Sequence, residues 1–312
     1  MADITAAMVK ELRELSGAGM MDCKKALSET NGDMDEAIEF LRKNGQAKAE
    51  KKAGRIAAEG ICRVALDGDK LAAVVEVNSE TDFVAKNENF QNFVEAVAKQ
   101  ALQSDSADLD AFMTESWIQD SSKTVKEVLV EQVAVIGENL NIRRFEKVTA
   151  QNGFVVSYVH GGGRIGVIVE AASNMVTDTL KEAMTNLAMQ VAALAPKYVS
   201  TDEISDEYKE HEKEIIKAQI LTDPKMEGKP EKVIDGAVIG RLNKQMKEIC
   251  LLEQVYVKAE DSKQTVAQYV AQVAKEAGAK LSIKRFVRFE TGEGIEKKNE
   301  NFAAEVAAQM GN

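Results

Sequence analysis

The chain has 312 residues, with 40 Lys or Arg against 51 Asp or Glu, and therefore a formal net charge of −11. Broad binding to nucleic-acid phosphates needs a clustered basic surface, so this balance argues against that class of protein. Two histidines and three cysteines are too few for the usual Cys/His metal clusters, and we expect no metal site. The length predicts roughly two domains.

Neither the first residues nor any later segment contains a long apolar run, so we expect no secretory signal and no membrane span. Cys23, Cys62 and Cys250 lie far apart and are odd in number, which favours reduced, packed thiols over a disulfide framework. Together these features predict a soluble protein of the cytoplasm.

The first part of the chain has the pattern of a small helical bundle. Apolar residues recur at helical spacing over residues 4–15, and Thr5 is placed to cap that helix. A second apolar set occupies residues 23–27, and Asp33 is placed to cap a third helix. Residues 47–55 are rich in Lys and Ala, which predicts a solvated helix or a linker.

From residue 60 the pattern changes to strands, and it occurs twice. Residues 60–77 form apolar runs around an Asp67-Gly68 turn, and residues 154–169 repeat them around a run of three glycines. An offset of 94 positions relates Gly68 to Gly162 and continues into the following helix. A constant offset over this length indicates an internal duplication.

Beyond that helix the offset changes. Residues 140–145 match residues 281–286 at an offset of 141, so the second copy contains 47 extra residues. All three prolines of the chain, Pro196, Pro224 and Pro230, fall inside this insertion. Its charged, amphipathic halves predict an antiparallel helical hairpin with coiled-coil packing that projects from the second copy.

Each copy reads as a hairpin, two helices and a final strand, which folds most simply as a three-stranded antiparallel sheet with helices on one face. We therefore predict an α+β fold with an N-terminal three-helix bundle, a duplicated core, an inserted helical hairpin and a C-terminal helix. The predicted boundaries are residues 1–55 for the bundle and linker, 56–150 and 151–290 for the core halves, about 200–254 for the hairpin, and 291–312 for the C-terminal module.

The glycine run after His160 is one candidate for chemistry. Residues 160–163 superficially match the oxyanion loop of some lipases, in which backbone amides stabilise a tetrahedral anion. The chain has no Gly-x-Ser-x-Gly nucleophile elbow and no phosphate-binding glycine loop. A plain turn between two strands is the interpretation that the Asp67-Gly68 turn of the first copy favours.

Residues 78–86 depart from the repeated pattern, because a stretch with charged residues and a phenylalanine directly follows a buried strand and has no counterpart in the second copy. In one interpretation Asp82 caps the next helix and Phe83 fills the core. In the other, the loop presents one acid and one aromatic ring to a partner protein.

Three stretches carry a family resemblance. They are the N-terminal residues 12–27 with Gly-Ala-Gly-Met-Met-Asp-Cys-Lys-Lys, residues 76–85 with Glu-Val-Asn-Ser-Glu-Thr-Asp-Phe-Val-Ala, and residues 289–296 with Gly-Glu-Gly-Ile-Glu. In these motifs, and in the order of its duplicated core and insertion, the chain resembles the bacterial translation elongation factor Ts family from Ile4 to Met310.

The resemblance implies a guanine-nucleotide exchange factor for elongation factor Tu, with no covalent chemistry and no cofactor of its own, acting on GDP and magnesium held by the partner. It implies that the N-terminal bundle is similar to ubiquitin-associated domains and contacts the partner's GTPase domain. A loop in the first core half would disturb the magnesium and phosphate site, and a turn in the second half would meet the partner's third domain. The expected residues are Arg13, Met20 and Met21 in the bundle, Thr81, Asp82, Phe83 and Val84 in the loop, and Tyr158, His160 and Gly161 at the turn.

The resemblance further implies that a C-terminal helix at residues 302–310 returns to the GTPase domain. Self-association or a 2:2 complex, through the core or the hairpin, stays open, and neither nucleic acid nor membrane is expected as a partner. Two competing classes are a small hydrolase built on His160 and an adaptor that binds ubiquitin-like surfaces through the bundle.

Overall fold

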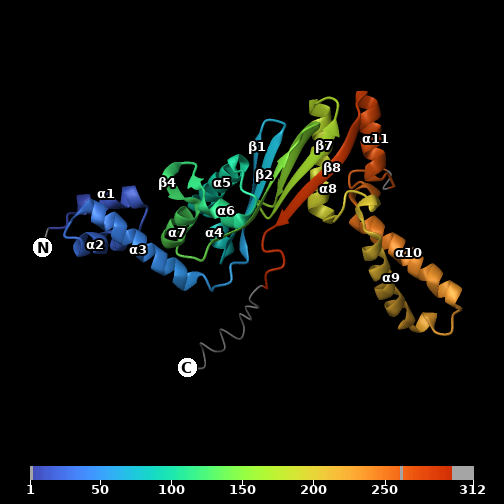
Figure 1. The fold of residues 1–312 in the computed structure, drawn as a ribbon, viewed down its shortest axis with the longest axis horizontal. Helices are drawn as coiled ribbons and strands as arrows, with labels where there is room; N and C mark the ends of the chain where they lie inside the picture. The colour runs from blue at the N-terminus through green and yellow to red at the C-terminus, as the bar shows by residue number, and fades with distance from the viewer. Residues whose placement is uncertain (1–2, 261–262, 297–312) are drawn as a thin grey trace.

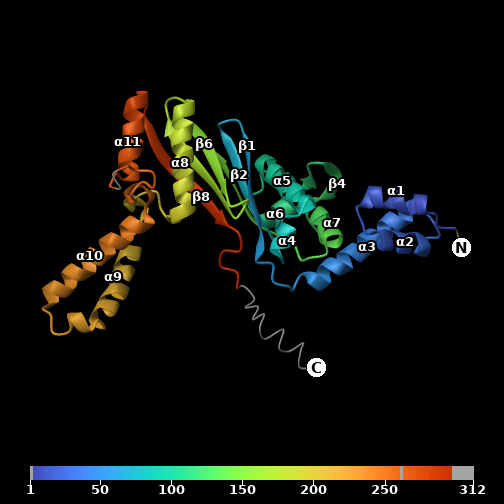
Figure 2. The same ribbon diagram turned by 180° about the vertical axis from the view of Figure 1, so that it is seen from behind.

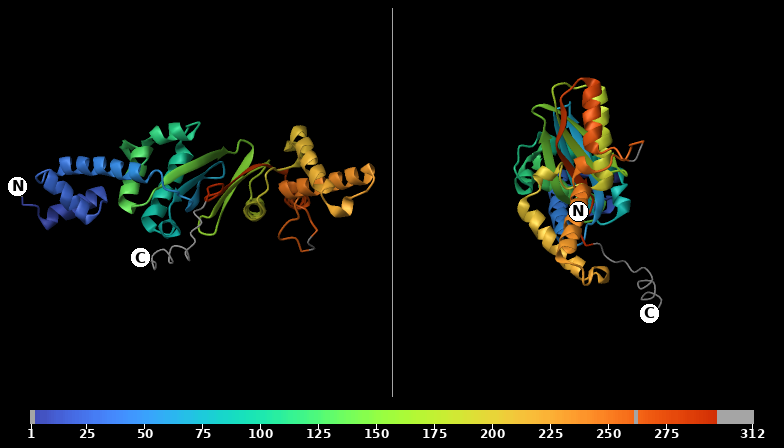
Figure 3. Two further views of the ribbon diagram at one scale, coloured as in Figure 1. Left: turned by 90° about the horizontal axis from the view of Figure 1, so that it is seen from below. Right: turned by 90° about the vertical axis from the view of Figure 1, so that its right-hand side faces the viewer.

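The structure, a computed structural model, describes residues 3–260 and 263–296. The described part is elongated, with a three-helix unit at one end, a helical hairpin at the other and a core of two sheets between them (Figures 1 and 3). The predicted helix at residues 302–310 lies outside the described residues. Within them, no helix is both long and apolar enough to cross a membrane.

The N-terminal unit consists of α1 (Ala6–Ser16), α2 (Met20–Glu29) and α3 (Met34–Lys52). The Thr5 hydroxyl caps α1 and the Asp33 carboxylate caps α3, as the sequence predicts. The Lys/Ala-rich stretch, residues 47–55, continues α3 as far as Lys52, and its last three residues form a turn. Six buried side chains form the centre of this unit: Val9, Leu12, Cys23, Ala26, Leu27 and Ala37.

The first core half is built on an antiparallel sheet of order β1-β2-β5. Its strands are β1 (Glu59–Asp67), β2 (Leu71–Ser79) and β5 (Asn141–Thr149), and its main helices are α5 (Glu88–Gln103) and α7 (Val125–Ile136). The short α4 (Asp82–Ala85) follows β2 directly. Three small elements were not predicted: α6 (Leu109–Thr114) and the hairpin of β3 (Ser116–Trp117) and β4 (Asp120–Thr124).

The second core half repeats this plan in a sheet of order β6-β7-β8. Its strands are β6 (Gly153–His160), β7 (Ile165–Ser173) and β8 (Leu281–Glu290), and its helices are α8 (Asp178–Leu194) and α11 (Val266–Ala277). β2 and β7 correspond at the offset of 94, and α7 and α11 at the offset of 141. Both sheets also have a register shift at the same place, after Glu76 and after Glu170.

Strands β1 and β6, the first strand of each sheet, correspond at a different offset from the predicted 94. Gly60 pairs with Asn78 and Gly153 pairs with Ala172, so these two glycines occupy equivalent places 93 positions apart. The cause is one additional residue in the turn between β6 and β7. A turn can absorb such an insertion without shifting the strands that follow, even though Gly163 of this turn is buried against β1.

The two sheets pack face to face, and the helices cover their outer faces (Figures 1 and 2). The sequence predicts helices on one face of each sheet but does not say what covers the other. Side chains from both sheets meet there in one buried cluster, and this explains why β2 is apolar on both sides. The cluster comprises Cys62, Ala72, Val74, Val148, Ala150, Val155, Ile168, Val287 and Phe289.

The insertion forms a hairpin of α9 (Asp206–Leu221) and α10 (Glu231–Ile249), accompanied by the 3-10 turns η1 (Thr201–Glu203), η2 (Pro224–Met226) and η3 (Leu251–Glu253). Gln245 donates to Glu212 at 2.6 Å between the two helices. The hairpin has a cluster of its own, formed by Ile204, Ile216, Ile220, Val238, Leu242, Met246 and Cys250. Pro196 lies at its entry, and the other two prolines lie at its tip.

Candidate functional site

The loop between β2 and α5 presents an exposed aromatic ring. Phe83, on the single turn of α4, has 80% of its surface exposed, the largest fraction among the exposed large hydrophobic residues of the described chain. The residues that precede it, Asn78 and Ser79, are fully buried at the end of β2. The chain thus passes from the core to an exposed phenylalanine within four residues, and the interpretation that placed Phe83 in the core is wrong.

Thr81, rather than Asp82, caps the short helix. The Thr81 hydroxyl accepts a hydrogen bond from the Val84 amide at 3.3 Å. Val84 packs against the hydrophobic core of the first half. Thr81 and Val84 therefore anchor the two ends of the turn that exposes Phe83.

Asp82 is exposed and pairs with Lys86 on the next turn, with 2.7 Å between the carboxylate and Nζ. The hydrogen bond from Lys86 lowers the pKa of the Asp82 carboxyl below its ordinary value. The group is therefore ionised at neutral pH. Asp82 and Phe83 place a negative charge and an apolar ring side by side on one exposed turn.

A second carboxylate holds this loop from outside. Glu138, just after α7, accepts hydrogen bonds from the amides of Glu80 and Thr81 at 3.0 Å each and from the Thr81 hydroxyl at 2.7 Å. The Glu80 carboxylate in turn accepts from the Asn139 amide at 2.6 Å. Two segments that are distant in sequence thus fix one another at the base of α4.

The buried Glu76 lies at the centre of a further network. Its carboxylate accepts from Arg143 at 2.9 Å, from Arg144 at 2.6 Å and from the backbone amide of Gly292 at 2.8 Å. Burial alone would raise the pKa of Glu76, but the hydrogen bonds from Gly292, Asn78 and Arg143 lower it below its ordinary value. The network ties the segment after β8 to the first sheet.

The residues expected to act in the N-terminal unit lie on its surface. Met20 and Met21 are 58% and 75% exposed, and Leu15, near the end of α1, is 63% exposed. Arg13 is also exposed. Exposed long apolar side chains gathered on one small unit are typical of a protein interaction surface.

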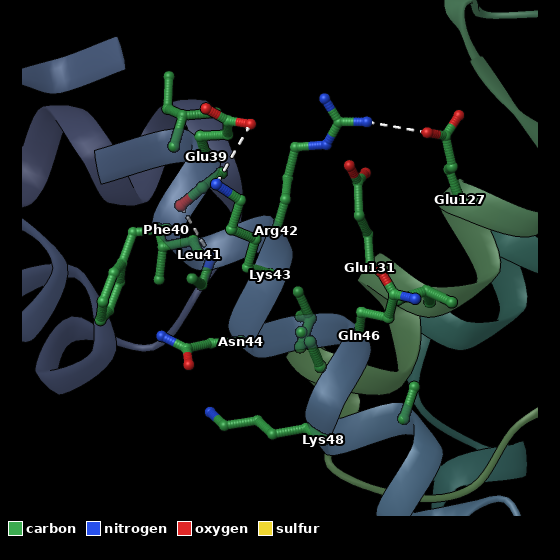
Figure 4. A pocket seen from close by; sticks show the side chains of 18 of the residues that line it. Glu39, Phe40, Leu41, Arg42, Lys43, Asn44, Gln46, Lys48, Glu127 and Glu131 are labelled. Carbon is green, nitrogen blue, oxygen red and sulfur yellow. Dashed lines mark hydrogen bonds and ion pairs between the residues drawn. The ribbon is translucent and has the colours of Figure 1, made fainter. Parts of the chain in front are cut away.

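The N-terminal unit packs on the core through α3 and α7, with a groove of about 870 Å³ beside the contact (Figure 4). Arg42 reaches across to Glu127 at 2.9 Å, as Figure 4 shows. Lys52 donates to the Gly137 carbonyl at 2.6 Å. These contacts hold α3 against the same segment that carries Glu138.

His160 lies at the end of β6, where its Nδ1 is 2.9 Å from the Tyr158 hydroxyl. Within the described residues its hydrogen-bond partner is therefore a phenol, not a Ser or Cys nucleophile. Gly161 begins the turn, and the Gly163 carbonyl accepts from the Cys62 amide at 2.6 Å. The hydrolase interpretation thus gains no nucleophile from the structure, and the turn packs on β1.

The predicted residues do not form a single pocket. Helices α1 and α2, which carry the exposed Arg13 and methionines, lie at one end of the described molecule, whereas α4 and β7 lie in its middle part (Figure 1). Among the described residues, no group of three or more His, Cys, Asp or Glu side chains is arranged to hold a metal ion. Such a spread of exposed features suits contact with a large partner.

Sequence reasoning missed Glu138 and the role of Glu76. Glu138 had a detectable signal, because the duplication aligns it with Ala279 in the second copy. The acid is therefore present only in the copy that also has the Phe83 loop, and this difference could have drawn attention to it. The Glu76 network had no such signal, because the matching residue is also an acid, Glu170.

The comparisons with known proteins agree with one another. A family model described as "Elongation factor TS" matches residues 80–293. The chain belongs to the elongation factor Ts family. An elongation factor Ts of Clostridium novyi (strain NT) is 50% identical over 308 residues, which cover 98% of this chain and 99% of that protein. Another, of Clostridioides difficile (strain 630), is 51% identical over 311 residues, covering 99% and 100% respectively.

Proposed function

We propose that this elongation factor Ts family member is a guanine-nucleotide exchange factor for elongation factor Tu, and that it acts in the cytoplasm without covalent chemistry or a cofactor. Family membership supports the partner. The observation that carries the proposal is the 80% exposed Phe83 on a loop fixed by hydrogen bonds. Single exposed apolar residues are common on protein surfaces, but here Thr81, Val84 and Glu138 fix the turn that holds the ring out, as an aromatic anchor for a partner requires.

The proposed mechanism is conformational competition. Asp82 and Phe83 enter the partner near its magnesium and phosphate site, while Thr81 and Val84 hold their turn in place. Speeding GDP release about 10³-fold needs about 4 kcal/mol, whereas burying one phenyl ring supplies about 1.5–3 kcal/mol. Phe83 therefore acts together with a wider interface.

The exposed surfaces elsewhere supply that wider interface. We assign Arg13, Met20 and Met21, on a bundle similar to ubiquitin-associated domains, to the partner's GTPase domain. We assign the turn at Tyr158, His160 and Gly161 to its third domain. By linkage, nucleotide then weakens binding of the factor as much as the factor weakens binding of nucleotide. The coiled-coil hairpin or the core is the proposed surface for any self-association.

The test is release of fluorescent GDP from elongation factor Tu, with the full chain added as wild type or as Phe83→Ala. Loss of the ring's burial predicts catalysed release about 10- to 160-fold slower, the factor that 1.5–3 kcal/mol represents. The melting curve should barely move, because an exposed side chain contributes little to stability.

Leu66→Ala is the matched control. Leu66 is 46% exposed on β1, near the turn at the opposite end of the sheet from α4, and its loss should leave exchange unchanged. Exchange by Phe83→Ala at the wild-type rate would refute the role of the loop. Binding of the partner that survives Phe83→Ala, with no acceleration of GDP release by wild type or variant, would instead favour an adaptor that uses the N-terminal bundle.

A further inference from the structure

The Glu138 carboxylate is an unusual component of the first core half. It follows Gly137, which ends α7, and it makes no ion pair with a neighbouring base among the described residues. All three of its hydrogen bonds go to the loop that carries Phe83: two amide groups at 3.0 Å and the Thr81 hydroxyl at 2.7 Å. The carboxylate thus binds the loop as an anion held by backbone amides, and such charge-assisted bonds are the stronger ones.

The duplication provides an internal control for what this contact does. In the second copy the Lys280 amide donates to the Asn174 side chain at 2.7 Å, just as the Asn139 amide donates to Glu80 at 2.6 Å in the first. This bond joins the same two segments in both halves and belongs to the shared scaffold. The three hydrogen bonds of Glu138 to the loop, called the Glu138 clamp below, have no counterpart in the second copy, because Ala279 takes the position of Glu138.

The Glu138 clamp and the loop with Asp82 and Phe83 both occur in the first copy and not in the second. The second copy lacks the Asp-Phe pair and continues directly into α8, whose cap is Thr177. It folds into the same sheet and helices without a clamp. The clamp is therefore not a requirement of the duplicated fold, and it occurs in the one half that presents an exposed aromatic ring.

We propose that Glu138 is a positioning residue for nucleotide exchange, which holds the turn of Thr81 to Phe83 in its binding geometry in the free protein. This inference rests on the proposed function of the loop. Ordering a loop on binding costs conformational entropy, and a loop that is already ordered avoids this cost. Glu138 acts through Phe83 and does not itself act on the nucleotide.

Four variants of the full chain test this role by fluorescent GDP release from elongation factor Tu. Glu138→Ala removes all three bonds, and Glu138→Gln keeps one oxygen for the two amides while removing the charge. Phe83→Ala, alone and combined with Glu138→Ala, completes a double-mutant cycle. Glu131→Gln is the matched control: it is also a carboxylate of this region, but it pairs with Lys123 at 2.8 Å and does not touch the loop.

Glu138→Ala should slow catalysed release about tenfold, which corresponds to about 1.4 kcal/mol. Glu138→Gln should slow catalysed release about threefold or less, because the amide oxygen of Gln can still accept from the backbone. In the Phe83→Ala background, Glu138→Ala should slow catalysed release no more than about twofold further, because the clamp then has no ring to position. Glu131→Gln should exchange at the wild-type rate.

Two results would overturn the proposal. An equal loss for Gln and Ala would mean that the charge itself acts on the partner, and an undiminished loss in the Phe83→Ala background would mean that Glu138 acts independently of the ring. Failure of the proposed function is distinguishable, because Phe83→Ala alone would then have no effect. A folding defect is also recognisable, because it would persist in the Phe83→Ala background and would appear in the melting curves.

Discussion

Replacing the buried Glu76 by Gln should destabilise the first core half strongly. The carboxylate is fully buried and receives hydrogen bonds from Arg143, Arg144, Asn78 and the Gly292 amide. The Gln oxygen can replace Oε1, which accepts three of these bonds. Its NH₂ group would then face the Arg144 Nε–H group, so one buried donor meets another. Removing one partner of a buried ion pair costs about 3–5 kcal/mol, and we expect the lower end because the shape is kept.

The matched control is Glu170→Gln, the equivalent position in the second sheet. Glu170 is also buried, but its partners are Arg285 at 3.0 Å and Lys284 at 3.7 Å, with no bond from the described residues that follow β8, 291–296. Its loss should cost about 1–2 kcal/mol. Urea unfolding followed by circular dichroism gives both values. The single Trp117, buried in the first half, reports whether that half unfolds together with the rest.

The pH dependence of stability provides a second check. The hydrogen bonds place the pKa of Glu76 below its ordinary value of 4.5 in the folded protein. A group with a lowered pKa stabilises the fold above its unfolded pKa, and this contribution is lost as the pH falls through the folded value. The stability difference between wild type and Glu76→Gln should therefore be constant above about pH 5 and shrink below about pH 4. A difference that persists unchanged in acid, or a Glu170→Gln cost as large as that of Glu76→Gln, would refute this reasoning.

Two further changes test the architecture. Replacing residues 205–247 by a short linker should leave the rest folded, with its exchange activity largely retained. Removing residues 201–254 should destabilise the second core half, because Leu251 is fully buried there and Gln254 bonds to Gln190. Circular dichroism and GDP release compare the two deletions, and equal stability would contradict this assignment. Gly292→Ala should lower the free energy of unfolding by more than about 1 kcal/mol, since φ is +72° and the new Cβ would lie 2.1 Å from the Ala58 carbonyl oxygen. Gly294→Ala is the control with similar φ, where the new Cβ would make only an ordinary contact at 3.9 Å with the Arg143 side chain, and an equal loss in urea unfolding would leave only backbone strain as the cause.

The features that local chemistry determines could be predicted from the sequence. Thr5 and Asp33 cap their helices as expected, because a capping side chain bonds amides within the next three residues. The duplicated strands and helices follow from periodicity. The insertion is marked by a change of offset, which needs only counting. Each of these signals lies within one element or in a comparison of the chain with itself.

The features that were missed depend on contacts between distant segments. The face-to-face packing of the sheets joins strands of the two core halves, and apolar periodicity does not say which face meets which. Glu138 bonds mainly to backbone amides of residues 80 and 81, and a backbone donor carries no sequence signature. The position of Phe83 was left open for the same reason, since a phenylalanine after a strand fits a core as readily as a surface.

The duplication separates what the fold needs from what the surface presents. The bulge after Glu76 recurs after Glu170, and Arg144 on the first carboxylate matches Arg285 on the second, so this buried pair belongs to the scaffold. Asp82, Phe83 and Glu138 have no counterparts, although both halves form the same sheet. Stability alone therefore does not account for these three residues. An exposed ring, the acid beside it and the carboxylate that fixes their turn are explained together if a partner selects their geometry.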